Sequence, residues 1–147
     1  MTARGLTVLE LLVTLGLVGL LAAIALPSFG AMRARARLGA AARQVVMDLK
    51  LARTRAITDV ASHRVRFPAL SSSYQHQRQG SDGRYADEGA PVPLPEGVGI
   101  ESCTAAGAAV GFQPRGHAST FGSITLRGEE GGGRRIVVDI VGRMRIE

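Results

Sequence analysis

Cysteine, tryptophan and lysine are nearly missing from this chain of 147 residues. Cys103 is the only cysteine, which excludes an intrachain disulfide and a cluster of thiolate metal ligands. Aromatic residues make up 4% and apolar residues 46% of the sequence, so we expect a core of aliphatic side chains. Lys50 is the only lysine among 18 basic residues, which exceed the 12 acidic ones and give a net charge of +6. Arginine suits contacts to carboxylate and phosphate groups, although a GC-rich genome produces the same bias.

Motifs of known catalytic chemistry are also lacking. The chain has three histidines, His63, His76 and His117, in no metal-binding spacing. The glycines at 131–133 do not form a phosphate-binding loop. Asp59 lies four residues before His63 near a predicted helix end, which is typical of a cap or a surface pair, and Cys103 is interpreted as a small buried hydrophobe. We therefore expect no enzyme activity, no cofactor and no metal ion.

A long apolar run lies near the start of the chain. Between Leu6 and Phe29, 24 residues, the only charged residue is Glu10. A helix of this length rises about 36 Å, which exceeds the roughly 30 Å hydrocarbon core of a bilayer. The sequence therefore predicts a transmembrane helix over residues 6–28, which excludes an ordinary soluble cytoplasmic protein.

Three interpretations of this run remain open. The first is a secretory signal, because Ala23-Ile24-Ala25 precedes Pro27 and fits cleavage after Ala25. The second is a plain membrane anchor. An ionised carboxylate in a membrane helix costs about 2.5–3.5 kcal/mol at mid-bilayer and less near the interface. Neither a signal peptide nor a plain anchor explains why Glu10 stands in the apolar run. A third interpretation must give this acid a partner.

Residues 5–13, GLTVLELLV, resemble the processing motif of type IV prepilins and type II secretion pseudopilins. The resemblance implies that residues 1–5 are a leader peptide and that a prepilin peptidase cuts between Gly5 and Leu6 on the cytoplasmic side. It also implies that the new amine of Leu6 is methylated. Leu6 stands where the family usually has phenylalanine, and Pro27 stands where the family often has a helix-kinking proline.

The same resemblance gives Glu10 a partner. In a filament, its carboxylate can pair with the terminal amine on Leu6 of a neighbouring subunit. Two buried opposite charges offset each other's desolvation, whereas either one alone is costly. Glu10 is therefore expected to set the register of assembly, and the alternative is a glutamate that snorkels to the membrane interface.

The flanking charges disagree with the orientation that the resemblance implies. Arg4 precedes the run, and four arginines follow it: Arg33, Arg35, Arg37 and Arg43. The positive-inside rule alone places the C-terminal part in the cytoplasm. The resemblance implies the opposite, a single-pass protein of the bacterial inner membrane with its C-terminal domain in the periplasm, incorporated into a filament after processing. We follow the resemblance because its motif is the more specific signal.

A second helical segment is predicted over residues 29–60. One stripe of apolar residues follows spacings of three and four: Leu38, Ala42, Val45, Leu49, Ala52, Ala56 and Val60. An amphipathic helix of this kind needs a module that covers its stripe. The arginines between Arg33 and Arg55 suit anionic lipid headgroups or nucleic acid, and the lack of interleaved aromatic residues favours lipid.

Short strands are expected in the rest of the chain, residues 61–147. The predicted strands are 63–67, 98–103, 110–113, 122–126 and a final run from Ile136 to Val141, with a turn at 128–133. Residues 71–95 are polar and rich in glycine and proline, which predicts a long loop or a loosely paired region of variable conformation. The expected fold class is α+β, type IV pilin-like, in which one long N-terminal helix packs on a small antiparallel β domain.

The C-terminal residues 136–147, together with 112–116 and 121–124, resemble the GspH/FimT group of minor pilins and pseudopilins. Within them stands Gly142-Arg143-Met144-Arg145. On a strand, Arg143 and Arg145 share one face and Met144 and Ile146 point the other way, into the core.

This ending has two interpretations. The resemblance implies that some competence-linked members bind DNA through such a motif, with Gly142 allowing close approach and Arg143 and Arg145 contacting phosphates. Alternatively, Gly142 makes a hairpin turn and the arginines pair with Asp139 or Glu147 or stay solvated.

The sequence therefore favours a minor pilin or pseudopilin of a type II secretion or type IV pilus filament, acting in assembly or at the tip. Its expected partners are other pilin-like subunits, the prepilin peptidase/methyltransferase and inner-membrane lipid. Two alternatives stay open: a DNA-binding minor pilin for DNA uptake, and a secreted protein cut by ordinary signal peptidase after Ala25.

Overall fold

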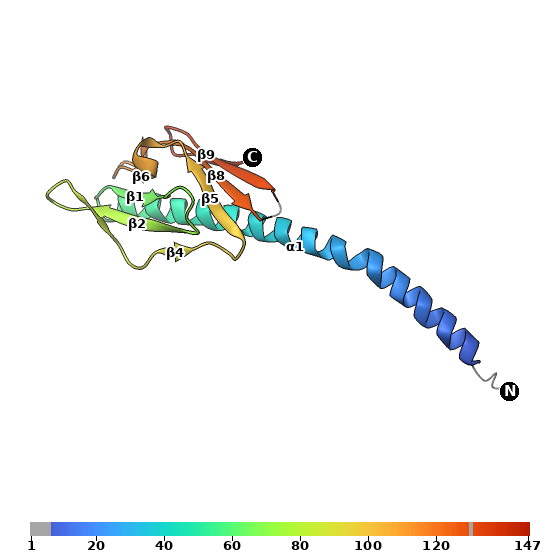
Figure 1. The fold of residues 1–147 in the computed structure, drawn as a ribbon. Coiled ribbons are helices and arrows are strands. Elements are labelled where there is room, and N and C mark those ends of the chain that lie inside the picture. The colour runs from blue at the N-terminus through green and yellow to red at the C-terminus, as the bar shows by residue number, and fades with distance from the viewer. Residues whose placement is uncertain (1–6, 130) are drawn as a thin grey trace, which may run out of the picture. The chain divides into compact units, whose positions relative to one another are not determined.

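The computed structural model describes residues 7–129 and 131–147, without the side chains of residues 24–29. Contacts within the chain form two compact units, Met1–Arg33 and Ala34–Glu147. Figure 1 shows the elements of both units. The second unit contains all of the strands and the second half of the helix, so the compact domain begins at Ala34 and not after the helix.

One helix, α1, runs over Val8–Thr58. Thr7 caps its start, because the Thr7 hydroxyl accepts a hydrogen bond from the Glu10 backbone N–H at 3.3 Å. The helix ends two residues earlier than predicted: Val60 has a φ of 51° and is 76% exposed. Val60 was therefore wrongly included in the apolar stripe. Pro27 lies within the bounds of α1, but its side chain is outside the described residues, so the kink stays a prediction.

None of the helices within the described residues combines the length and the apolar composition that a membrane crossing needs. Leu6 and the side chains of residues 24–28, all within the predicted span, lie outside the described part of the chain.

Two antiparallel sheets make up the rest of the domain. The strands are β1 (His63–Arg66), β2 (Ser73–Gln79), β3 (Tyr85–Asp87), β4 (Val92–Pro93), β5 (Val98–Cys103), β6 (Ala109–Phe112), β7 (Ala118–Thr120), β8 (Gly122–Gly128), β9 (Gly133–Val138) and β10 (Met144–Ile146). One sheet has the order β3-β2-β1-β6-β7, with β4 beside β2, and the other has the order β10-β9-β8-β5. A short 3-10 helix, η1 (Ala106–Ala108), precedes β6. The predicted α+β class is confirmed.

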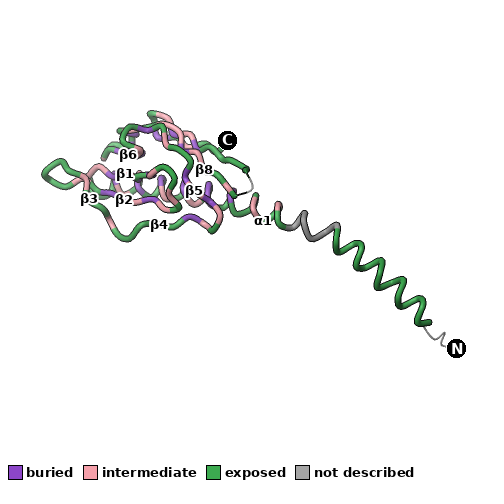
Figure 2. Tube along the Cα trace, viewed as in Figure 1, coloured by how far each residue is buried: buried purple, intermediate pink, exposed green. Residues whose placement is uncertain are grey.

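The second half of α1 packs on both sheets. Six residues of the predicted stripe are buried: Leu38, Ala42, Val45, Leu49, Ala52 and Ala56. They form one cluster with sheet residues such as Val65, Phe112, Ile124 and Ile136. Figure 2 shows this burial along the domain. Alanines at four helix positions, Ala41 included, keep the helix face flat enough to lie close to the sheets.

Of the two alternatives predicted for 71–95, the long loop is wrong, because β2, β3 and β4 lie there. The strand β2 is almost entirely polar, SYQHQRQ, and so lacks the alternation of apolar residues that predicts a strand. Tyr74, His76 and Gln77 of this strand are buried nevertheless. Their polar atoms have partners: Gln77, for example, accepts a hydrogen bond from Arg64 at 2.6 Å and donates one to Asp87 at 2.6 Å.

The other strand predictions hold with shifted ends. The predicted strands at 63–67, 98–103, 110–113 and 122–126 correspond to β1, β5, β6 and β8. The final predicted strand is too long, because β9 ends at Val138 and the exposed Ile140 lies in the following turn. The strand β7 was not predicted. Its three residues are too few to show a pattern.

Candidate functional sites

Glu10 lies in the first turn of α1, where a negative charge is favourable toward the helix dipole. Its side chain is exposed, as are the described apolar side chains around it from Val8 to Leu21. An apolar surface on all sides of a helix is stable only in lipid or against other apolar helices. Gly5 and Leu6, the predicted cleavage and methylation positions, lie outside the described residues.

The Gly142–Arg145 motif begins in a tight turn between β9 and β10. The Asp139 backbone N–H donates to the Arg143 carbonyl at 3.0 Å, and the Gly142 N–H donates to the Asp139 carbonyl at 2.9 Å. The Asp139 carboxylate accepts from the Arg143 backbone N–H at 2.8 Å and from its Nε at 2.9 Å. These contacts, first the backbone N–H and then the guanidinium, hold the pKa of Asp139 below its usual range. Arg143 is thus engaged within the turn.

Gly142 is buried inside the domain and is not open to a ligand. It has a φ of 81°, and a Cβ at this position would lie 3.2 Å from the Gly116 carbonyl oxygen and 3.5 Å from the guanidinium carbon of Arg53. Arg53 of α1 also donates to the Gly142 carbonyl at 3.3 Å. Glycine is required here because the left-handed turn packs tightly against the helix and the neighbouring turn.

Arg143 and Arg145 do not both lie on a strand. Arg143 belongs to the turn. Arg145 lies on β10, where it pairs with Val137 of β9, and its side chain is exposed. Met144 packs against the core, as expected. Ile146 does not, since it is 41% exposed, so its predicted place in the core is wrong. The strand β10 is the edge of its sheet, and an edge residue is covered from one side only.

The arginines along α1 are partly used within the domain. Arg37 donates to the Glu96 carbonyl at 3.3 Å, Arg53 to Gly142, and Arg55 lies 3.3 Å from the Glu88 carboxylate. Arg33, Arg35 and Arg43 are exposed. Contact with lipid headgroups stays a prediction for these three.

A buried polar cluster between α1 and the sheet was missed by the sequence interpretation. The Tyr74 hydroxyl donates to the Asp48 carboxylate and accepts from the Gln44 amide at 3.1 Å. Burial, followed by the Asp48 contact, raises the pKa of Tyr74. Burial lowers the pKa of His76, although the Asp48 carboxylate, 4.0 Å away, acts in the opposite direction. The available sequence signal was the spacing of Tyr74 and His76, two residues apart, which places both on one face of a strand.

His63 and Asp59 meet as their spacing suggested, but not on the surface. His63 is only 2% exposed, and its Nε2 lies 3.1 Å from Asp59 and its Nδ1 3.4 Å from Glu88. The described residues contain no group of side chains that is able to hold a metal ion. Cys103 is half-buried, and burial raises the pKa of its thiol, which favours the protonated form.

Acidification is expected to destabilise the domain through His76. Because burial lowers its pKa in the folded state, the unfolded chain takes up the proton more readily, and stability is lost as the pH falls below about 6.5. Thermal unfolding of the full chain between pH 7.5 and 5.5 measures this loss. The His76→Gln variant should show a shallower pH dependence, and an equal slope in both proteins contradicts the assignment.

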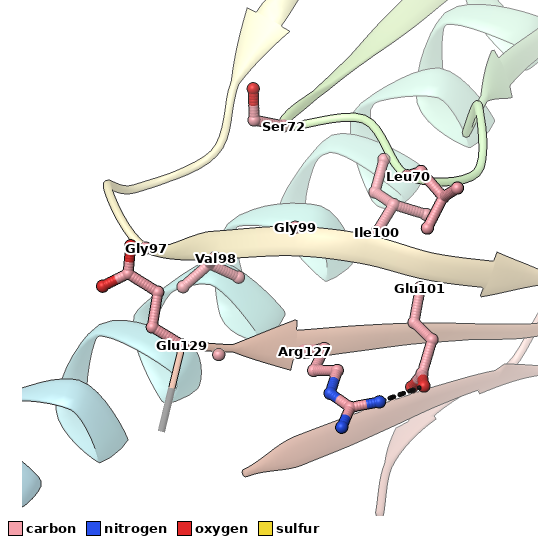
Figure 3. Close-up of a pocket in the computed structure, with 10 residues that line it drawn as sticks. Leu70, Ser72, Gly97, Val98, Gly99, Ile100, Glu101, Arg127 and Glu129 are labelled. Atoms are coloured by element: carbon pink, nitrogen blue, oxygen red, sulfur yellow. Dashed lines mark hydrogen bonds and ion pairs between the residues drawn. The ribbon is translucent and has the colours of Figure 1, made fainter. Parts of the chain in front are cut away.

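An open apolar groove of about 490 Å³ lies along β5 and the end of β8 (Figure 3). Leu70 stands on one side of Gly99, and the Arg127–Glu101 ion pair at 2.9 Å stands on the other. Leu70 is held in a left-handed conformation, with a φ of 59°, by a backbone hydrogen bond to Ile100 at 2.8 Å. The groove contains no set of convergent polar groups that would select a ligand.

A long N-terminal helix whose second half packs on antiparallel sheets is the type IV pilin-like fold. Two solved structures share it. The minor pseudopilin EpsH of the type II secretion system of Vibrio cholerae has a TM-score of 0.60 and 12% identity, over 76% of this chain and 96% of that chain. The type IV minor pilin FimU of Pseudomonas aeruginosa has a TM-score of 0.56 and 18% identity, over 77% and 90%. At these identities the likeness concerns the fold.

The family follows from the sequence match. The model of the family described as "Type II transport protein GspH" matches residues 41–142, which is more than half of the chain. The chain therefore belongs to the GspH family, and the resemblance noted from its ending is confirmed. A comparison with curated proteins found no match.

Proposed function

We propose that this chain is a minor pilin or pseudopilin subunit that is incorporated into a type II secretion or type IV pilus filament. The carrying observation is the combination of a GspH-family domain with a helix that exposes apolar side chains on every described side around one acid, Glu10. The exposed surface supports burial in lipid before assembly and against other helices afterwards.

The proposal gives each part of the chain a role. The prepilin peptidase cuts between Gly5 and Leu6 and methylates Leu6, and Glu10 pairs with this amine of a neighbouring subunit. Inner-membrane lipid holds the subunit before assembly, with the domain in the periplasm. The domain, whose core includes the second half of α1, then projects from the filament.

Mass spectrometry of the mature N-terminus tests this proposal. The expected terminus is N-methylated Leu6, because the recognition motif spans residues 5–13. A Gly5→Val variant is expected to remain as the uncut precursor, while a Gly39→Ala variant on the second half of α1 serves as the processed control. A terminus at Leu26, which ordinary signal peptidase would produce by cutting after Ala25, contradicts the proposal.

DNA binding is a second candidate, supported by one feature of the sheet. Arg145 and Arg135 lie on the same outer face, because Arg145 pairs with Val137 and successive residues of β9 alternate between faces. Against this, Arg143 is bound to Asp139 and Gly142 is buried. Any binding is therefore expected to be sequence-independent, salt-sensitive and centred on Arg145.

Titration of the full chain with duplex DNA at low and high salt tests this candidate. Replacing Arg143 and Arg145 with alanine should weaken DNA binding by about tenfold, because contacts to phosphate groups are lost. Each lost phosphate contact should also lower the salt dependence of the affinity. Arg66→Ala with Arg84→Ala removes the same charge from exposed positions on β1 and in the turn between β2 and β3, and is the matched control. Equal affinity of the two double variants discards the DNA-receptor hypothesis.

A further inference from the structure

The free edge of β10 has an unused set of backbone groups. Arg135 and Glu147 form a pair that exchanges two backbone hydrogen bonds, at 3.0 and 2.7 Å, and the Asp139 N–H donates to the Arg143 carbonyl at 3.0 Å. Such pairs alternate along an antiparallel ladder, so Arg145 also directs its N–H and C=O toward β9. The N–H and C=O groups of Met144 and Ile146 must therefore point away from the sheet. Among the described strands, none lies on that side of β10.

The side chains at this edge have opposite charges two residues apart. Arg145 and Glu147 are both exposed, and no ion pair within the described residues uses either of them. Both lie on the outer face of the sheet, because residues at i and i+2 of a strand share a face. Ile146 lies between them on the opposite face and is half-exposed.

We propose that β10 binds the β10 edge of a second copy of this chain, antiparallel and related by a two-fold axis at Ile146. In this register, the outward N–H and C=O of Ile146 exchange two hydrogen bonds with those of its copy. Arg145 of each chain then lies opposite Glu147 of the other, so the same ion pair forms twice. The two Ile146 side chains also cover each other on the inner face.

The charges decide this register. A two-fold axis placed at Arg145 would set this residue opposite its own copy, and like charges directly opposite each other on neighbouring strands are destabilising. Only the axis at Ile146 satisfies both the charges and the outward backbone groups. One short edge makes a weak contact, but subunits held in one membrane meet at a high effective concentration.

The contact goes beyond the proposed function and does not need processing, so it is tested on the full precursor in detergent micelles. Cys103 is first replaced with serine. An Ile146→Cys variant should then form a disulfide-linked dimer under mild oxidation, because paired Cα atoms in this position lie about 5.5 Å apart. Arg66→Cys, exposed on β1 in the interior of the other sheet, is the matched control and should not cross-link.

Charge exchange tests the register within the same cysteine variant. Arg145→Glu and Glu147→Arg, each alone, place like charges opposite each other and should reduce the cross-linked fraction by about five- to tenfold. The double exchange restores opposite charges and should restore cross-linking. Glu147→Arg alone adds positive charge and should strengthen duplex DNA binding while it reduces cross-linking, which separates self-association from a phosphate site.

Three results would overturn the proposal. They are no cross-linking at Ile146→Cys, equal cross-linking at Arg66→Cys, and single charge exchanges that cross-link like the parent. Thermal unfolding of each variant checks that the exposed substitutions leave the domain folded. Because filament incorporation and the N-terminal mass are measured separately, failure of this contact leaves the proposal of a filament subunit standing.

Discussion

Replacing Glu10 with alanine is expected to reduce incorporation of the subunit into filaments by at least about tenfold. In the proposed assembly the carboxylate neutralises the amine of Leu6 on a neighbour, and removing one partner of a buried ion pair costs about 3–5 kcal/mol. That cost corresponds to more than about a hundredfold in the equilibrium constant for incorporation. Partial solvation of the unpaired amine lowers the cost, so we expect at least about tenfold. The measurement is the ratio of this subunit in sheared filaments to that in membranes.

Two controls separate charge from helix formation in this experiment. Glu10→Asp keeps a carboxylate in the first turn and should retain part of the incorporation. Thr14→Ala, on the next turn of the helix, removes no charge; it removes a methyl group and a hydroxyl that donates to the Leu11 carbonyl at 3.0 Å, and should behave like the parent. If the alanine variant of Glu10 is both processed and incorporated as in the parent, the register role of this acid is wrong.

Replacing Leu49 with alanine is expected to destabilise the domain by about 2–5 kcal/mol, because this side chain is fully buried between α1 and the sheets and leaves a cavity when shortened. Thermal unfolding of the full chain in detergent, followed by tyrosine fluorescence, measures the loss. Tyr74 is a suitable probe since it is buried in the same cluster.

Met47→Ala is the matched control for this substitution. Met47 lies two residues away on the same helix but is 66% exposed, so its loss should change stability by less than about 0.5 kcal/mol. Similar destabilisation by both substitutions would mean that the face of α1 assigned to the core is wrong.

The amphipathic half of the helix was predictable because its signal is local and repeated. Six residues at spacings of three and four are buried as predicted. An α-helix is the regular structure whose period places residues at these spacings on one face. Val60 fails because the helix ends at Thr58, and helix ends depend on single residues whose effects are weak.

The polar strand β2 was not predictable in the same way. Its buried residues, Tyr74, His76 and Gln77, have polar groups whose partners come from distant parts of the chain. Asp48 and Gln44, which contact Tyr74, lie on α1. A hydrogen bond of this kind leaves no periodic pattern, so the sequence predicted a loop.

The Gly142–Arg145 motif shows the same division. The order of residues predicted both a phosphate site and a turn, and local spacing does not separate them. The structure engages Arg143 with Asp139 and covers Gly142 with Arg53, which is 89 positions away in the sequence. The contact that decides the role of the glycine is therefore tertiary.

The sequence by itself determined the family, the long helix and the place of Glu10 within the apolar run, because each depends on the order and spacing of neighbouring residues. Only the tertiary structure decided which arginines are free, which polar side chains are buried and which strand forms the open edge. Those properties arise from contacts between residues far apart in the chain, and each contact requires the whole domain to be folded.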